Sequence, residues 1–391
     1  MSGVDPSAAV AKQTKLAAEI FDELYNKTFD GVGVTRASYG EGEQVASELL
    51  ESHAKKLGLV IDHDAAGNIY MTMRGESQEA PPIVIGSHID SVAQGGNFDG
   101  AAGVISGLIA CASIIEKGIR LPQDIRVMGI RAEESAWFGV SYIGSRSALG
   151  TLPKDALDNA KRSDTGITLG EHMFKAGCNP DALRAGDIYL PPSSLKAYLE
   201  VHIEQGPVLD SKDLPLGIVT GIRGNRRLPS AQCIGEYSHC GGVPRSYRKD
   251  AVLAVTDLVN YLDRIWDDCE NEGKDFAFTV GKFFTDKEWH AMTKISGAVE
   301  FSLDMRSLDG DFIESMTKRV CEEALKIEQK RGVQFNLGDF TRAAPGPMDE
   351  HIKTRMLSGA DNLGIPYMEI ASGASHDAAA FAAAGVPTQM L

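Results

Sequence analysis

The chain has 391 residues, of which 43% are hydrophobic and 24% charged, as in an ordinary globular protein of about two domains. This composition excludes a disulfide-stapled mini-protein, a disordered chain and a collagen-like or coiled-coil chain. The 39 basic and 54 acidic residues give a net charge of -15, which repels a phosphate backbone, so we expect no nucleic-acid partner.

The chain carries no sign of a membrane or secretory segment. No apolar run approaches the roughly 18 residues of a membrane span, and the first residues lack the apolar stretch of a signal peptide. The six cysteines are scattered, without the spacing of a zinc ribbon or a disulfide framework. We therefore expect reduced cysteines, a cytoplasmic location and no membrane partner.

The first part of the chain alternates between helical and strand-like periods. The predicted elements are a helix over 41–59 that stops near Gly58, strands over 67–75 and 81–90, a buried helix over 101–118, and a strand over 124–135. This alternation predicts an α/β domain whose functional loops follow the carboxyl ends of its strands.

The second part has a different order of elements. These are a strand over 227–238, a helix over 249–271, strands over 276–284 and 297–309, a helix over 310–332, and a strand over 333–341. The order βαββαβ is typical of a small ferredoxin-like sandwich. It predicts a domain over 211–341, inserted into a catalytic domain made of 1–210 and 342–391, with a further helix over 349–364.

Histidines and carboxylates are concentrated in four short segments. They are His88, Asp90 and Asp99 in GSHIDSVAQGGNFDG, Glu133 and Glu134 in RAEES, His202 and Glu204 in HIEQG, and His376 and Asp377 in SGASHD. Imidazole and carboxylate without thiolate are the ligands of a hydrolytic zinc, manganese or cobalt site. A pair of ions needs a bridging carboxylate, and Asp99 suits this role because Gly95, Gly96 and Gly100 let the backbone fold tightly around it.

Each of these residues also has a purely structural interpretation. A single histidine beside a strand is commonly a buried, hydrogen-bonded residue, the two glutamates could start a solvated helix, and Asp90 could cap its own loop. Three histidines that are each followed closely by a carboxylate favour a metal hydrolase. Asp90 could then accept the second N–H of His88. Adjacent glutamates point in different directions, so one can bind metal while the other moves protons.

These motifs resemble the dimetal amidohydrolases related to aminoacylases and di-zinc exopeptidases. The similarity is to the branch with N-carbamoyl-L-amino acid hydrolases, β-ureidopropionase and allantoate amidohydrolase. The segments that carry it are GVTRASYGEGE, DAAGNIY, GSHIDSVAQGGNFDG, EES, HIEQGPVLD, HCGGVPRSYRKDA and SGASHDA. The resemblance implies a mixed-sheet catalytic domain of the di-zinc exopeptidase type, with the inserted domain serving for dimerisation or as a lid. It also implies two divalent metal ions, zinc first, with manganese and cobalt as alternatives.

The resemblance also assigns roles in the metal centre. It implies that His88, Asp99 and His202 hold one ion, and that Asp99, Glu134 and His376 hold the other. Glu133 becomes the general base, with Asp90 beside it, and His239 of the inserted domain stabilises the oxyanion. For His239 a surface histidine at a strand end remains the alternative.

The resemblance further implies a set of substrate-binding residues. They are Gln205, Thr293, Arg306 and Gly373. An arginine such as Arg306 can grip a carboxylate with two hydrogen bonds, and in relatives the matching residue comes from the partner subunit, which implies a homodimer joined through the inserted domain. An exposed strand arginine in a salt bridge is the alternative.

The expected activity is hydrolysis of the amide C–N bond of an N-carbamoyl or related N-acyl L-amino acid, a small-molecule substrate. Allantoate or another ureido acid, an N-acyl amino acid and a dipeptide are alternative substrates. A metal-stabilised protein that only binds a small acid is the alternative outside enzymes, although binding alone needs neither a free base nor an oxyanion donor.

Overall fold

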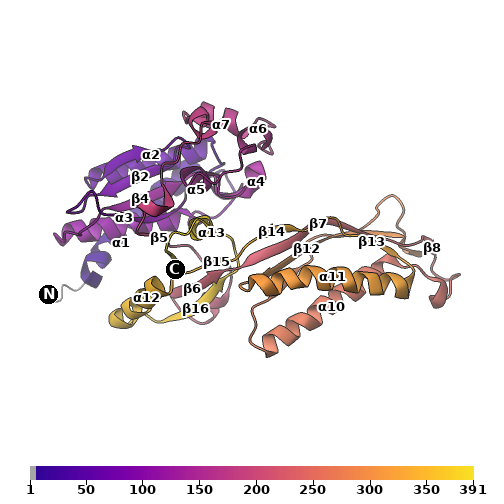
Figure 1. Ribbon diagram of the computed structural model, residues 1–391. Helices are drawn as coiled ribbons and strands as arrows, with labels where there is room; N and C mark the ends of the chain where they lie inside the picture. The colour runs from indigo at the N-terminus through magenta and orange to yellow at the C-terminus, as the bar shows by residue number, and fades with distance from the viewer. Residues whose placement is uncertain (1–5) are drawn as a thin grey trace. The chain divides into compact units, whose positions relative to one another are not determined.

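The computed structural model describes residues 6–391 and divides into two compact units (Figure 1). Unit 1 comprises the chain up to Thr220 together with Pro347–Leu391, and unit 2 comprises Gly221–Gly346. The sequence places the same two borders slightly earlier, at 210/211 and 341/342. Among the described residues, no helix combines the length and the apolarity that crossing a membrane requires.

Unit 1 contains a mixed sheet with helices around it. The strands of this sheet are β1 (Val60–His63), β2 (Ile69–Met73), β3 (Ile83–His88), β4 (Ile125–Ile130), β5 (Ala197–Glu200) and β17 (Thr388–Met390). The longer helices are α1 (Pro6–Thr28), α2 (Glu41–Lys56), α3 (Ala101–Glu116) and α12 (Glu350–Leu363). The short ones are α4 (Ser135–Phe138), α5 (Ile143–Ala148), α6 (Ala156–Asn159), α7 (Leu169–Lys175), α8 (Pro180–Arg184), α9 (Val208–Ser211), α13 (Asp377–Ala383) and the 3₁₀ turn η1 (Pro192–Ser194).

The order of the strands decides where the functional loops lie. The sheet runs β1-β2-β4-β3-β5-β17, with β3 parallel to both β4 and β5 and with β2 antiparallel to β4. The carboxyl ends of three parallel neighbours meet at one edge of a sheet. The residues that follow β3, β4 and β5 therefore share that edge, as the alternating pattern predicts.

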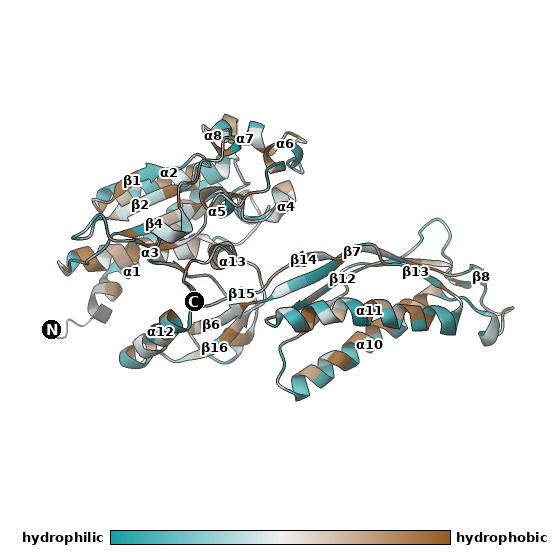
Figure 2. Ribbon diagram, in the orientation of Figure 1, coloured by the Kyte–Doolittle hydropathy of each residue, from teal (hydrophilic) through white to brown (hydrophobic). Residues whose placement is uncertain are grey.

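Helix α3 is the central packing element of unit 1. It lies against β3 and β4 and is covered by α1, while α2 packs on α1, β1 and β2; the apolar residues of these elements form one buried cluster. Figure 2 shows α3 with little hydrophilic colour, in agreement with its near-complete burial. On another part of the sheet, Phe381 of α13 stacks on Tyr198 of β5, with ring centroids 3.7 Å apart. The sheet edge with the loops is thus fixed by packed helices.

A small three-stranded sheet lies where the chain leaves and re-enters unit 1. Its order is β15-β6-β16, formed by β15 (Gly346–Pro347), β6 (Leu216–Ile222) and β16 (Tyr367–Ser372). The strand β16 leads directly to the segment that carries His376.

Unit 2 consists of a sheet with two long helices on it. The strands are β7 (Gly224–Ile234), β8 (Ser238–His239), β9 (Ala277–Thr279), β10 (Phe283–Thr285), β11 (Lys294–Ile295), β12 (Ala298–Ser307), β13 (Gln334–Asn336) and β14 (Thr341–Ala343). The helices are α10 (Ala251–Asn271), α11 (Gly310–Arg331) and the 3₁₀ turn η2 (Arg245–Tyr247). The main sheet has the order β10-β12-β7-β13, with β9 also on β12 and β14 also on β7.

Three strands predicted as continuous are each divided in the structure. The predicted strand 227–238 ends as β7 at Ile234, and Ser238 begins β8. The predicted strand 276–284 forms β9 and β10, whose registers on β12 differ by one residue, so the residues between them act as a bulge. The predicted strand 333–341 forms β13 and β14, and Gly338 between them has a φ of +70°, which a strand cannot continue.

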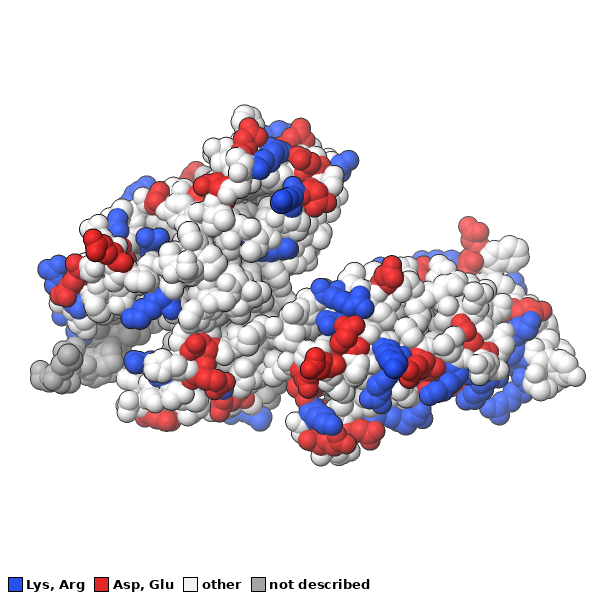
Figure 3. Space-filling view, viewed as in Figure 1, with Lys and Arg blue, Asp and Glu red and all other residues white. Residues whose placement is uncertain are grey.

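The core of unit 2 lies between the sheet and its two helices. Burial alternates along β12, where Val299, Phe301, Leu303 and Met305 face the buried cluster, as a strand with one covered face requires. Helices α10 and α11 pack on each other and on that face, and their outer surfaces carry basic and acidic residues side by side (Figure 3). Unit 2 therefore has its own hydrophobic core.

Candidate metal centre

Three predicted ligands meet at the carboxyl edge of the sheet in unit 1. His88 ends β3, His202 follows β5, and Asp99 directly precedes Gly100 and α3. The Nε2 atoms of the two histidines lie 3.3 Å apart. Oδ1 of Asp99 lies 3.3 Å from Nε2 of His202 and 3.7 Å from Nε2 of His88. Ligand atoms of these three residues all lie within 4.8 Å of one another, as a shared ion requires.

Hydrogen bonds fix the orientation of both imidazoles. Nδ1 of His88 lies 3.0 Å from the carbonyl oxygen of Asp90, and Nδ1 of His202 lies 3.0 Å from that of Ile203. A carbonyl only accepts, so Nδ1 carries the proton in each ring and the lone pair of a neutral ring is on Nε2. The Nε2 atoms of His88 and His202, the nitrogens available to a metal ion, therefore face each other.

The donor set fits a cation. Oδ1 of Asp99 is buried and has no hydrogen-bond partner among the described residues. Although burial opposes it, the imidazoles of His202 and His88 lower the pKa of Asp99 to about 2, so this ligand is an anion near neutral pH. Two imidazole nitrogens and a carboxylate oxygen within 4.8 Å of one another form the nitrogen and oxygen donor set of a divalent cation. Divalent zinc, manganese and cobalt all accept such nitrogen and oxygen ligands.

Gly100 allows Asp99 to approach His88 this closely. Its φ is +64°, and a Cβ atom at this position would lie 2.5 Å from the His88 ring. A side chain would therefore both strain the backbone and collide with the imidazole. The sequence predicts a glycine at this position for a tight turn; the structure shows that the positive φ and the contact with His88 require it.

Glu133 and Glu134 follow β4 and reach His88 from the neighbouring strand. Ligand atoms of His88, Glu133 and Glu134 form a second group within 4.8 Å. Asp90 holds the backbone of the pair, because its Oδ1 accepts the N–H of Glu133 at 3.0 Å and its Oδ2 accepts that of Glu134 at 3.2 Å. Asp90 also accepts the hydroxyl of Ser38 at 2.6 Å, so it is buried with its bonds satisfied.

Ala132, immediately before the glutamates, has a left-handed backbone with a φ of +54°. An alanine rarely adopts this conformation, which indicates local strain. Its N–H donates to Oε1 of Glu43 at 2.8 Å, and its carbonyl accepts the N–H of Ile143 at 3.0 Å. The strained turn is thus held by partners on both sides.

Glu133 has the properties of a proton carrier. It is buried, and burial raises its pKa well above the ordinary value, assisted by the negative charges of Asp377 and Glu134 and opposed by His88. A carboxyl group with a raised pKa can exchange protons near neutral pH. Glu134 is only partly buried, and burial raises its pKa as well.

His376 lies beside the cluster but outside both ligand groups. Its ring centroid is 4.2 Å from that of His202, and its Nε2 is 2.9 Å from the hydroxyl oxygen of Ser372. Burial and the neighbouring His202 and His88 lower the pKa of His376 well below its usual value, so the ring is neutral, the form in which histidine binds metal. The three histidines therefore lie together, while His376 is engaged with Ser372.

Of the predicted substrate residues in unit 1, Gln205 contacts the metal centre itself. Its Nε2 donates to Oδ2 of Asp99 at 3.0 Å, so it fixes the carboxylate whose other oxygen faces the histidines. Gly373 lies between β16 and His376. Glu204 is not a ligand, because its carboxylate accepts the N–H groups of Val208 and Leu209 at the start of α9.

The remaining predicted residues belong to unit 2, where His239 and Thr293 lie together. His239 pairs with Lys294 across β8 and β11, and the carbonyl of Thr293 accepts the N–H of Cys240 at 2.9 Å. Gly241 N–H lies 3.2 Å from Nδ1 of His239, so this nitrogen accepts and Nε2 carries the proton. The ring is exposed, so its Nε2–H is a candidate hydrogen-bond donor to a bound group.

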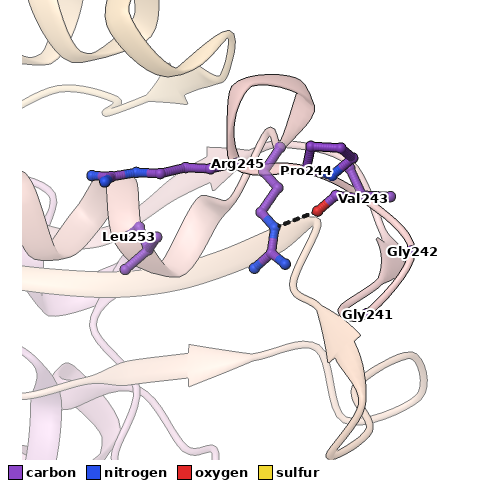
Figure 4. A pocket seen from close by; sticks show the side chains of 7 residues that line it. Gly241, Gly242, Val243, Pro244, Arg245 and Leu253 are labelled. Atoms are coloured by element: carbon purple, nitrogen blue, oxygen red, sulfur yellow. Dashed lines mark hydrogen bonds between the residues drawn. The ribbon is translucent and has the colours of Figure 1, made fainter.

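The loop after His239 borders a pocket of about 570 Å³. Its lining residues are Gly241, Gly242, Val243, Pro244, Arg245, Arg248 and Leu253 (Figure 4). Arg248 supports the loop with two hydrogen bonds. Its Nε donates to the carbonyl of Val243 at 2.9 Å, the dashed line in Figure 4, and its Nη2 donates to the carbonyl of Cys240.

Arg306 lies at the other end of the long strand β12 from His239. It is opposite Asn225 of β7, whereas the first residue of β12, Ala298, is close in sequence to β11, which pairs with β8 in a separate two-stranded sheet. The guanidinium of Arg306 pairs with Asp304 through Nε at 3.0 Å and Nη2 at 2.9 Å. Within this chain Arg306 thus makes the strand salt bridge named as the alternative.

Sequence reasoning missed several residues that build the site. Arg36 and Glu43 are buried charges that bond to the loops carrying the ligands, and Ser372 engages His376. Asp377, by contrast, was among the candidate carboxylates; it lies outside both ligand groups, and its carboxyl accepts the hydroxyl of Ser145 and so joins α13 to α5. The sequence signal that could have indicated them is that these charged residues stand in segments rich in glycine and other small residues.

Comparison with known proteins agrees with this geometry. The family model described as Peptidase family M20/M25/M40 matches residues 84–391. The N-carbamoyl-L-amino acid amidohydrolase of Geobacillus stearothermophilus is 35% identical over 349 residues, which are 88% of this chain and 82% of that protein. The allantoate amidohydrolase of Bacillus subtilis (strain 168) is 29% identical, over 90% of this chain and 83% of that protein.

A solved structure gives the same result for the fold. The crystal structure of a hydantoinase/carbamoylase family amidase from Burkholderia ambifaria has a TM-score of 0.83 and 30% sequence identity, and the match covers 96% of this chain and 89% of that one. The chain therefore belongs to peptidase family M20/M25/M40, and within it to the amidohydrolase group of these relatives.

Proposed function

We propose that this amidohydrolase uses two divalent metal ions to cleave the amide C–N bond of N-carbamoyl L-amino acids or related N-acyl L-amino acids. The observation that carries the proposal is the cluster of His88, His202 and Asp99 beside the buried Glu133. The substrate class, N-carbamoyl L-amino acids, is supported by the similarity to the N-carbamoyl-L-amino acid amidohydrolase of Geobacillus stearothermophilus.

The proposed ligands are those that the resemblance implied. His88, Asp99 and His202 would hold one ion, and Asp99, Glu134 and His376 the other, once His376 turns from Ser372. The bound ions would supply a Lewis acid for the substrate carbonyl. Zinc is our first choice of metal, with manganese and cobalt as alternatives.

Glu133 would act twice in the reaction. It first takes a proton from the attacking water, which adds to the carbamoyl carbon. It then delivers this proton to the amino nitrogen as the C–N bond breaks. The products are the amino acid and carbamate, which decomposes to carbon dioxide and ammonia. We propose that Asp90 holds Glu133 in place and that Nε2–H of His239 stabilises the oxyanion.

Ammonia release tests the proposal. Metal-free protein is reconstituted with Zn²⁺, Mn²⁺ or Co²⁺ and assayed with N-carbamoyl L-amino acids, their D enantiomers and N-acetyl L-amino acids, the last by amino-acid release. We expect turnover of the L compounds, and a loss of about 10²-fold or more in Glu133→Gln with the metal content unchanged. Equal activity of both proteins would contradict the role of Glu133. Metal binding without turnover of any compound would favour a binding protein.

A second candidate substrate is allantoate or another ureido acid, because the relative from Bacillus subtilis is an allantoate amidohydrolase. The same assay with allantoate and ureidoglycolate separates the candidates by their kcat/KM. N-acyl amino acids and dipeptides would yield no ammonia, so their cleavage is measured by the released amino acid.

We further propose a homodimer joined through unit 2, which is expected to be a ferredoxin-like dimerisation or lid domain, in a cytoplasmic protein. Gln205, Thr293, Gly373 and Arg306 would contact the substrate, the last from the partner subunit. The six free cysteines are consistent with a reducing compartment. Sedimentation of the purified protein tests the dimer, and sedimentation as a monomer at micromolar concentration would contradict it.

A further inference from the structure

Arg36 is a fully buried cation next to the metal centre, on the same unit of the chain. Its Nε donates to the carbonyl of Ile89 at 2.8 Å, and its Nη2 donates to the carbonyl of Asp99 at 3.0 Å. Ile89 directly follows the ligand His88, and Asp99 is itself a proposed ligand. One guanidinium therefore joins the two ends of the loop that connects these ligands.

The backbone around Arg36 holds the same loop in the middle. Arg36 N–H donates to the hydroxyl of Ser91 at 2.9 Å, and Ser91 N–H donates to the carbonyl of Arg36 at 2.9 Å. Two further bonds join Val34 and Gly95 in both directions, at 3.0 and 2.8 Å. Residues 34–38 thus lie along the loop 89–99, and the Arg36 side chain contacts both ends of this loop.

Within the described part of the chain, the guanidinium of Arg36 bonds to backbone carbonyls and to no carboxylate, although the carboxylates of Asp90, Asp99 and Glu134 surround it. Among the described residues its Nη1 is buried without a hydrogen-bond partner. Burial lowers its pKa to about 10, against the opposing charges of Asp90, Asp99 and Glu134, so the group remains charged at neutral pH. Because an apolar side chain would fill such a position at a smaller desolvation cost, the burial of a guanidinium calls for another explanation.

We propose that Arg36 is a positioning residue of the metal centre: it holds the Ile89 and Asp99 carbonyls so that Asp99 and His88 present their ligand atoms to one ion. The inference rests on the metal centre of the proposed function. The fixed cation also balances part of the negative charge of the surrounding carboxylates, which would otherwise separate before an ion binds.

Two variants test this inference. Arg36→Lys keeps the charge but cannot reach both carbonyls with a planar fork, and Arg36→Met keeps the apolar volume without the charge. The affinities of metal-free protein for Zn²⁺ and Mn²⁺ are measured by competition with a chromogenic chelator. We expect both variants to bind about 10- to 100-fold more weakly than the unchanged protein, the range found when supporting partners of ligands are removed. Their metal-free forms should keep the native circular dichroism spectrum.

Arg226 provides the matched control. It is also a buried arginine, and its Nη1 donates to two backbone carbonyls, those of Asn225 and Ala343, but it belongs to unit 2. Arg226→Lys should leave the metal affinity unchanged. Metal affinities of both Arg36 variants equal to that of the unchanged protein would overturn the inference alone. Failure of both variants to fold would also overturn it, because Arg36 would then serve the fold. An unchanged protein that binds neither ion would overturn the proposed metal centre and this inference together.

Discussion

The Nε2 atoms of His88 and His202 face each other at 3.3 Å, while the opposite nitrogen of each ring bonds to a backbone carbonyl. The two rings come from parallel neighbouring strands, β3 and β5, so the sheet fixes their separation. With the Asp99 oxygen beside them, the folded chain brings electron-rich atoms together at a free-energy cost that a bound cation removes.

A cation at this place should raise the stability of the protein. A ligand at 100 times its Kd adds about 2.7 kcal/mol to the free energy of unfolding. We expect Zn²⁺ or Mn²⁺ to raise the melting temperature of the metal-free protein by several degrees and a chelator to reverse the change. His202→Ala should lose this response, as differential scanning calorimetry can show.

His290→Ala is the control for nonspecific binding to histidine. His290 is exposed and bonds to Thr285 in unit 2. This variant should respond to the ions as the unchanged protein does. A response of His202→Ala equal to that of His290→Ala would argue against an ion at the cluster.

Asp90 should matter for turnover through the backbone it holds. Its carboxylate accepts the N–H groups of both Glu133 and Glu134, and Asn can accept only one of them. We expect Asp90→Asn to lower the kcat of the metal-saturated enzyme by about 10- to 100-fold. Ser38→Ala removes only the hydroxyl bond to Asp90 and should lower kcat less. Equal kcat values for Asp90→Asn and the unchanged enzyme would contradict this role.

The convergence of His88, Asp99 and His202 could be predicted because it depends on local pattern and sheet geometry. His88, Glu133 and His202 each follow an apolar run, and neighbouring parallel strands end at one edge. The strand–helix order also predicts the main elements of unit 2 and, in unit 1, the strands β2, β3 and β4 and the helices α2, α3 and α12, but not α1 or the short helices α4 to α9. The division between β9 and β10 could not be predicted from the sequence, because a one-residue register shift depends on the partner strand and not on the period of the segment.

The supporting polar partners could not be predicted for a related reason. Whether Arg36 or Glu43 is exposed or buried depends on which distant loop covers it. The residue type alone predicts an exposed side chain for both. Likewise, the hydrogen bond from the amide of Gln205 to Asp99 could not be foreseen, although the resemblance places Gln205 in the site as a substrate-binding residue. Contacts between side chains from separate segments follow from packing, which periodicity does not encode.

The buried pair of Glu43 and Arg131 should be important for stability. Nε of Arg131 donates to Oε2 of Glu43 at 2.7 Å, Nη2 forms an ion pair with the same oxygen at 2.7 Å, and both side chains are nearly inaccessible. Glu43→Gln leaves the arginine buried without its counter-ion, which we expect to lower the free energy of unfolding by about 3–5 kcal/mol. Urea denaturation of the metal-free protein measures this change.

The double variant Glu43→Leu with Arg131→Met separates the charge from the packing. Because it removes both charges together, it should lose less stability than Glu43→Gln. A loss in the single variant below about 1 kcal/mol would show that the pair contributes little.

An ion pair in unit 2 should make stability depend on pH at the acidic end. Arg331 and Lys330 bond to Asp257 at 2.7 to 3.1 Å, and these bonds lower the pKa of Asp257 below its usual 3.8. A carboxylate with a lowered pKa stabilises the fold above pH 3.8 and loses this effect as the pH falls through its folded value. We expect Asp257→Asn to be less stable by about 0.5–1 kcal/mol at pH 7, with the difference shrinking below pH 3.8.

Asp263 on the same helix supplies the comparison for this effect. It is exposed and has no ion pair among the described residues, so Asp263→Asn should change the free energy of unfolding little at either pH. Urea denaturation of the three proteins at pH 7 and pH 3 gives the differences directly. If the deficit of Asp257→Asn were the same at both values, the ionised carboxylate could not be its cause, and lost packing at α10 and α11 would explain it instead.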